Sequence, residues 1–94
     1  MYRYLTLLRF TEKGLKTVKR STARAAAFRA VAAKAGVKVD AQYWTAGAYD
    51  GVVILSSKSE DRIFQCLAAL AAAGNVRTET LRAMDGKEFK SIAK

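Results

Sequence analysis

The chain of 94 residues contains no histidine, no proline and a single cysteine. Without histidine it lacks the commonest metal ligand and the commonest general base, which narrows the enzyme classes open to it. Cys66 cannot form a disulfide within the chain because no second cysteine is present. We also find no metal-spaced cluster of ligands, no glycine-rich phosphate loop and no nucleophile elbow. We therefore expect no metal and no cofactor, and we assign no catalytic residue.

Long hydrophobic runs are also missing. The alanine-rich stretch 63–73 is far too short to span a bilayer, and the N-terminal residues lack the features of a signal peptide. With 51% hydrophobic and 27% charged residues, the composition is typical of a globular protein. We expect one soluble, cytoplasmic domain over residues 1–94, with no contact to a membrane.

Acidic residues are scarce. The chain has 8 aspartates and glutamates and 17 lysines and arginines, which gives a net charge of +9. The imbalance is concentrated in the first 40 residues, and no acid occurs between Lys13 and Lys38. Such a basic region could attract nucleic acid or an anionic ligand, or it could be a solvated face that keeps the protein soluble.

The first third of the chain predicts a strand followed by an interrupted helix. Residues 2–10 are rich in the residue types that strands favour, and Thr11 offers an N-cap for a helix that begins directly after it. The apolar stripe changes phase along this helix, so we expect a break at which Ser21 or Thr22 caps a second segment. Gly36 then ends the second segment as a C-cap glycine.

The middle of the chain predicts two strands. Residues 37–45 alternate between less polar and more polar side chains, so every second residue should point to the same face of the sheet. Residues 47–51 are the connecting turn, and the pair Asp50–Gly51 suits a tight hairpin because both residues tolerate positive φ. Residues 52–55, "VVIL", form the next strand. In the strand 37–45, the residues expected on the better-buried face are Val37, Val39, Ala41, Tyr43 and Thr45.

The last third predicts a helix, a strand and a short helix. Ser57 and Glu60 match a capping box that opens the helix, and Gly74 with the following asparagine closes it. Residues 76–84 form a threonine-rich strand. The pair Asp85–Gly86 then leads into a short C-terminal helix.

The order strand, helix, strand, strand, helix, strand predicts an α+β, ferredoxin-like βαββαβ fold. Right-handed crossovers place both helices on one face of a four-stranded antiparallel sheet, with the first and third strands in its centre. No internal repeat or linker divides the chain.

The first strand and "VVIL" are apolar on both faces, whereas two helices cover only one face. Leaving Tyr4, Leu8 and two residues of "VVIL" in water would forgo about 1.5–3 kcal/mol per large side chain. We therefore expect the chain to form a homodimer or a larger closed oligomer through this face. The alternative is that the short C-terminal helix folds back over it.

Three segments resemble the GYD domain family: "TEKG" at 11–14, "YWTAGAYD" at 43–50 and "GNVRTETLRA" at 74–83. The resemblance covers nearly the whole chain. It implies a ferredoxin-like fold similar to the dimeric α+β barrel proteins, in a family without a settled biochemical role. The naming segment has Ala48 where a bulkier residue often stands, and "SSKSEDRIFQ" is less acidic than in many relatives.

The candidate ligand-binding residues lie in the naming segment and the last strand. Asp50 could orient a ligand beside Tyr49, or it could simply hydrogen-bond its own backbone in the turn. Aromatic and threonine side chains, including Trp44, could line a pocket, although they are also ordinary strand formers. Arg77 could bind an anion, or it could pair with Glu79. The full candidate set is Tyr43, Thr45, Tyr49, Asp50, Arg77, Thr78 and Glu79.

Three classes of function are open. The first, which we favour, is an oligomeric small-molecule-binding or structural module whose ligand is a small anionic or aromatic compound. The second is an enzyme of the dimeric α+β barrel type, with Asp50 and Glu79 as a carboxylate pair. The third is weak, non-specific nucleic-acid binding through the basic first helix. Base stacking on the sheet is disfavoured, because "VVIL" contains no aromatic residue.

Overall fold

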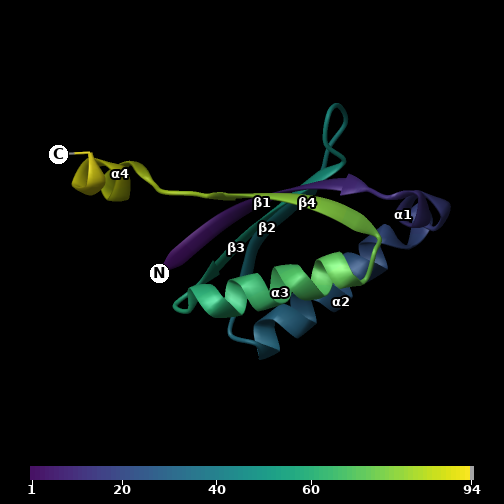
Figure 1. Ribbon diagram of the computed structural model, residues 1–94, viewed down its shortest axis with the longest axis horizontal. Coiled ribbons are helices and arrows are strands. Elements are labelled where there is room, and N and C mark those ends of the chain that lie inside the picture. The colour runs from purple at the N-terminus through teal and green to yellow at the C-terminus, as the bar shows by residue number, and fades with distance from the viewer. Residues whose placement is uncertain (94) are drawn as a thin grey trace.

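The computed structural model describes residues 1–93 and confirms the predicted ferredoxin-like fold. Four antiparallel strands form one sheet in the order β2-β3-β1-β4, and α2 and α3 lie side by side on one face of it (Figure 1). The elements are β1 (Tyr2–Phe10), α1 (Glu12–Lys16), a 3-10 turn (Val18–Arg20), α2 (Ser21–Lys34), β2 (Lys38–Trp44), β3 (Gly51–Ser57), α3 (Glu60–Ala72), β4 (Val76–Arg82) and α4 (Gly86–Ile92).

The predicted helix break is present, but its cap is not the predicted one. Thr11 caps α1 as expected, because its hydroxyl oxygen accepts a hydrogen bond from the Gly14 amide at 3.1 Å. The N-cap residue of α2 is Arg20, which makes no side-chain capping bond. Ser21 instead accepts a hydrogen bond from the indole N–H of Trp44 at 2.9 Å. This bond ties the start of α2 to the end of β2.

A β-bulge in β2 overturns the predicted alternation. The register of β2 against β3 shifts between Val39 and Ala41, so Asp40 is the extra residue. Val39 pairs with the buried Leu55, whereas Ala41 pairs with Ile54 on the other face. Residues 41–44 therefore present the opposite faces from those that strict alternation predicts, because one extra residue inverts a pattern of period two.

The connection between β2 and β3 is a six-residue loop, 45–50, and not a tight turn at Asp50–Gly51. Neither residue has positive φ; within the loop Gly47 does, at +131°. Gly51 is needed for another reason, since a Cβ there would lie 3.0 Å from the Tyr43 carbonyl oxygen across the ladder. The loop projects from the sheet on the side opposite the helices (Figure 1).

The start of α3 also differs from the prediction. Its N-cap is Ser59, whose hydroxyl oxygen accepts from the Arg62 amide at 3.4 Å. Ser57 is still in β3, and its hydroxyl donates to the Gly36 carbonyl at 2.8 Å while accepting from the Ser59 amide at 3.1 Å. The cap is therefore the serine two residues after the predicted one, and Ser57 instead links β3 to the end of α2.

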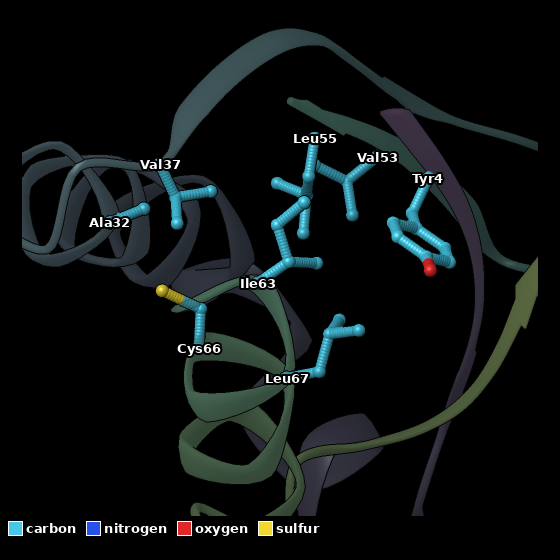
Figure 2. Packing of buried hydrophobic residues seen from close by; sticks show 8 residues of the cluster. All are labelled: Tyr4, Ala32, Val37, Val53, Leu55, Ile63, Cys66 and Leu67. Atoms are coloured by element: carbon cyan, nitrogen blue, oxygen red, sulfur yellow. The ribbon is translucent and has the colours of Figure 1, made fainter. Parts of the chain in front are cut away.

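The core lies between the sheet and the start of α3 (Figure 2). Leu55 from β3 and Ile63 from α3 are both 0% exposed, and Val37 fills the space at the end of α2. Tyr4 also points into this cluster, and Leu8 packs against it. The expectation that these two side chains lie on the uncovered face is therefore wrong.

The sheet face opposite the helices, which we call the open face, is apolar at its centre. Register places Leu5 opposite Ile54 and Leu7 opposite Val52, all four on this face and all partly exposed. Leu81 of β4 extends the apolar area and is exposed. The expected apolar character of this face is thus present, although with other residues of β1.

The C-terminal helix does not cover the open face. Figure 1 shows α4 at the far end of an extended arm, away from the sheet. A capping box at Asp85 and Glu88 starts the helix, and Glu88 also pairs with Arg3 at 2.9 Å. Phe89 and Ile92 remain exposed. No helix within residues 1–93 has the length and apolar character needed to cross a membrane.

Candidate functional site

A cavity of about 320 Å³ lies between the sheet and the helices, beside the core, whose residue Val53 is part of the cavity wall. It exists because both helices present alanine there. Ala25 and Ala27 of α2, Ala69 of α3 and Ala73 at the end of α3 line it, and methyl side chains cannot fill the space between a helix and a sheet. The larger walls are Leu8, Phe28, Trp44, Val53 and Leu70.

The bulge in β2 places Trp44 in this cavity wall. Trp44 pairs with Gly51 on the helix side of the sheet, and its neighbour by two residues, Gln42, also lines the cavity. The indole N–H is used by the hydroxyl oxygen of Ser21. Trp44 is 49% exposed, so its ring stands at the mouth of the cavity and closes part of it.

Hydrogen bonds fix the far wall of the cavity. The Thr11 amide donates to the Asn75 carbonyl at 3.0 Å, and the Thr11 hydroxyl donates to the Gly74 carbonyl at 2.6 Å. A Cβ on Gly14 would lie 2.0 Å from the same Asn75 oxygen, so only glycine allows this approach. Residues 11–14 are thereby held against the end of α3.

Asp50 attaches the segment 43–50 to the end of β1, close to residues 11–14. Its carboxylate accepts a hydrogen bond from the Phe10 amide at 2.8 Å, and its own amide donates to the Leu8 carbonyl at 2.8 Å. Its side chain thus bonds to β1 and not to the turn. The three segments that resemble the GYD domain family therefore meet around the end of β1, and Phe10, Asp50 and Asn75 all line the cavity.

A second polar cluster lies on the open face beside the 45–50 loop. The Tyr49 hydroxyl donates to a Glu79 carboxylate oxygen at 2.6 Å. The Arg9 guanidinium lies 4.6 Å from the centre of the Tyr49 ring and donates to the Ala48 carbonyl at 3.0 Å. The hydrogen bond to the Glu79 carboxylate is the main cause that raises the pKa of Tyr49 above its ordinary value.

The structure divides the predicted residues between these two regions. Asp50 lines the cavity, whereas Tyr49 and Glu79 form the open-face cluster. Tyr43 borders the cavity, but it pairs with Val52, so its side chain lies on the open face. Arg77 lies opposite Arg9 on the same face, while Thr78 and Leu8 face the helices. Thr45 is in the loop, where its hydroxyl donates to the Tyr49 carbonyl at 2.6 Å.

This division has two consequences for the predicted roles. Glu79 bonds to Tyr49, and its expected ion pair with Arg77 is absent from the described residues. Asp50 borders the cavity while Glu79 lies on the open face, so the two carboxylates do not share a cleft.

Sequence reasoning did not assign six polar or aromatic residues of the lining to a cavity: Phe10, Ser21, Arg24, Phe28, Gln42 and Asn75. For Gln42 the missing information was the bulge, which no local pattern announces. For Arg24 a signal existed, since it is a cation on the predicted helix with Phe28 four residues later on the same face. That spacing places the positive charge of Arg24 beside the apolar face of the helix.

Residues 1–93 contain no group of three or more histidine, cysteine, aspartate and glutamate side chains that could hold a metal ion. Cys66 belongs to the core cluster and is buried. Burial raises the pKa of its thiol, which disfavours the reactive thiolate.

The sheet with its two helices, and an apolar cavity between them, defines the chain as a small ferredoxin-like α+β domain. The family model described as "GYD domain" matches residues 4–93, so the chain belongs to the GYD domain family. No curated protein matches the chain.

Solved structures support the fold. FFRP-DM1 superposes with a TM-score of 0.65 at 15% sequence identity, covering 89% of this chain and 100% of that one. TTHA0845 from Thermus thermophilus superposes with a TM-score of 0.57 at 24% identity, covering 92% and 96% of the two chains. At these identities the likeness concerns the fold alone.

Proposed function

We propose that this protein is a small-molecule-binding module whose ligand occupies the cavity between the helices and the sheet, and which self-associates through its open face. The observation that carries the proposal is the cavity itself. Its volume of about 320 Å³ lies within the range of roughly 300–1,000 Å³ that is usual for small-molecule sites. Its walls are mainly apolar, with a few polar groups at the rim, which is the composition such sites favour.

The cavity is also braced. Trp44 is held by Ser21 at the mouth, and Thr11 and Gly14 are held against the end of α3 at the far wall. A pre-formed site loses less conformational entropy when a ligand binds. These bonds therefore favour a binding site over a packing defect that would close by relaxation of the helices.

The single tryptophan provides a direct test. N-phenyl-1-naphthylamine, a neutral apolar dye, should bind the protein, gain fluorescence and quench Trp44. Ala25→Phe places a ring in the cavity and should weaken binding about tenfold or more, since it fills the apolar space that the dye needs. Ala26→Phe is the matched control, because Ala26 is exposed and does not line the cavity.

Circular dichroism should show that both variants remain folded. Equal dye affinity for Ala25→Phe and the wild-type protein would contradict the proposed site. Dye binding that Ala26→Phe weakens as strongly as Ala25→Phe would also contradict it.

The apolar centre of the open face supports self-association into a homodimer or a larger closed oligomer. Leu5, Leu7, Val52 and Ile54 form a contiguous patch, and such patches on small soluble domains mark contact surfaces. Figure 1 shows α4 away from the sheet and the backbone of the 45–50 loop projecting from it. A second copy would bury it against an identical surface, as two-fold symmetry requires.

Sedimentation velocity tests this association. Leu7→Glu should shift the protein toward monomer, because it places a charge in the centre of the patch. Leu15→Glu is the control, since Leu15 is an exposed leucine outside the sheet, on α1. A wild-type protein that sediments as a monomer at micromolar concentration would rule the association out.

Nucleic-acid binding through the basic first helical segment is a second candidate. It is favoured by the exposed Lys19 and Arg20, which form no ion pair within residues 1–93. Such binding would be non-specific, so its affinity should fall steeply with salt. An affinity that is unchanged between low and physiological salt would exclude it. A cytoplasmic location remains a prediction.

A further inference from the structure

The cavity wall formed by α2 carries one positive charge, Arg24. Its Nη1 donates to the carbonyl oxygen and to the hydroxyl oxygen of Thr17, both at 2.9 Å, and its Nη2 lies 3.4 Å from the Gly14 carbonyl. All three acceptors are uncharged. Among residues 1–93 no carboxylate lies within 4.0 Å of the guanidinium. Arg24 is thus held in position while its charge has no counter-ion.

Two further groups of the cavity lining can donate hydrogen bonds. Ser21 lies three residues before it on α2, and since the Ser21 oxygen accepts from Trp44, its hydroxyl proton is available to a ligand. The Gln42 amide lines the same cavity from β2. The cavity lining therefore offers hydrogen-bond donors from both the helix and the strand.

A second charged residue of the cavity lining works against a second negative charge. Asp50 is the carboxylate that lines the cavity, and it uses one oxygen for the Phe10 amide. An anionic group near it would be repelled, because like charges raise the free energy of a partly dry site. The cavity lining thus carries one cation, Arg24, and one carboxylate, Asp50, and this balance favours a ligand with a single negative charge.

We propose that the cavity selects an apolar, aromatic molecule that carries a single negative charge. Its rings lie against Phe28, Trp44 and Leu70, and its anionic end accepts charge-assisted hydrogen bonds from Arg24. Since the contacts with Gly14 and Thr17 already fix the guanidinium, little side-chain entropy is lost on binding. This inference rests on the proposed function and adds the charge and shape of the ligand.

Two dyes with the same ring system test it. N-phenyl-1-naphthylamine is neutral, and 8-anilino-1-naphthalenesulfonate is the same scaffold with one sulfonate. At constant ionic strength the sulfonate should bind about tenfold or more tightly than the neutral dye, as a charge-assisted hydrogen bond implies. Both affinities can be measured by dye emission and by quenching of Trp44.

Arg24→Met should remove the preference for the sulfonate while the neutral dye still binds. Arg29→Met is the matched control, because Arg29 is an exposed arginine of the same helix that does not line the cavity. It should keep the preference. Arg24→Lys should retain part of it, which separates loss of charge from loss of the bonds to Gly14 and Thr17.

The outcomes distinguish this inference from the proposed function. If both dyes bind equally and Ala25→Phe still weakens both, the cavity is a binding site but the preference for an anion is wrong. If Arg29→Met lowers sulfonate binding as much as Arg24→Met does, the preference comes from the net charge of the protein and the role of Arg24 is wrong. If Ala25→Phe weakens neither dye, the proposed site itself fails.

Discussion

The two ends of the helix-covered layer differ although the same sheet and the same two helices build both. At one end Leu55, Ile63 and Val37 fill the space between α3, α2 and the sheet (Figure 2). At the other end alanines of both helices leave a cavity of about 320 Å³. The comparison shows that side-chain size along α2 and α3, and not topology, separates a structural core from a candidate binding site.

The largest expected difference concerns truncation of large side chains. Ile63→Ala in the filled end should lower the free energy of unfolding by about 2–5 kcal/mol, because it opens a cavity in a close-packed region. Leu70→Ala should cost about 1–2 kcal/mol, since Leu70 already borders empty space and loses mainly its own burial. Urea unfolding of both variants measures the difference. Equal losses would show that the two ends are packed alike.

Replacing an alanine by leucine should destabilise the protein at one end of α2 and have little effect at the other. Ala32 is 0% exposed, so Ala32→Leu should destabilise the protein by about 1–3 kcal/mol through overpacking. Ala25→Leu projects into the cavity, and we expect a change in unfolding free energy within about 0.5 kcal/mol of zero. The same urea experiment compares them. A strongly destabilised Ala25→Leu would mean that the cavity wall has no room.

The reaction rate of a cysteine thiol should also differ between the packed end and the cavity end. Cys66, at the filled end, should react with Ellman's reagent about tenfold or more slowly than a cysteine at the hollow end, because reaction there requires local opening. The comparison protein is Cys66→Ala combined with Ala69→Cys, which moves the thiol one helical turn to the cavity wall. Equal rates for the two proteins would contradict a tightly packed core.

The pH dependence of Cys66 follows from the direction of its shift. Burial raises the thiol pKa in the folded state above its unfolded value. The folded state is therefore favoured by the neutral thiol below the unfolded pKa, and this contribution is lost as pH rises through the folded pKa. Stability of the wild-type protein should fall more than that of Cys66→Ala as the pH is raised above about 8.5.

The fold was predictable because its signals are local. Thr11 and the glycines after α2 and α3 mark helix ends through chemistry that acts within one turn, and the alternation of strand and helix then leaves few topologies. The break before Ser21 was also visible, because the apolar stripe changes phase there. Each of these inferences needed only a short window of sequence.

The site was less predictable because its contacts are long-range. Asp50 was interpreted as a turn residue, yet its partner is the amide of Phe10, 40 residues away. The alanines of α2 were plain in the sequence, but their direction toward a cavity depends on how the helix packs. Tyr49 and Asp50 are adjacent in the chain, whereas Tyr49 bonds to Glu79 on the open face and Asp50 borders the cavity.

The extra residue at Asp40 has a consequence for how this architecture can change. Deleting that one position would restore strict alternation in β2 and carry the indole of Trp44 to the opposite surface of the sheet. The chamber would lose its aromatic lid, and the self-association surface would gain a large ring. The presence or absence of one residue thus decides whether the tryptophan side chain lies at the cavity or on the open face.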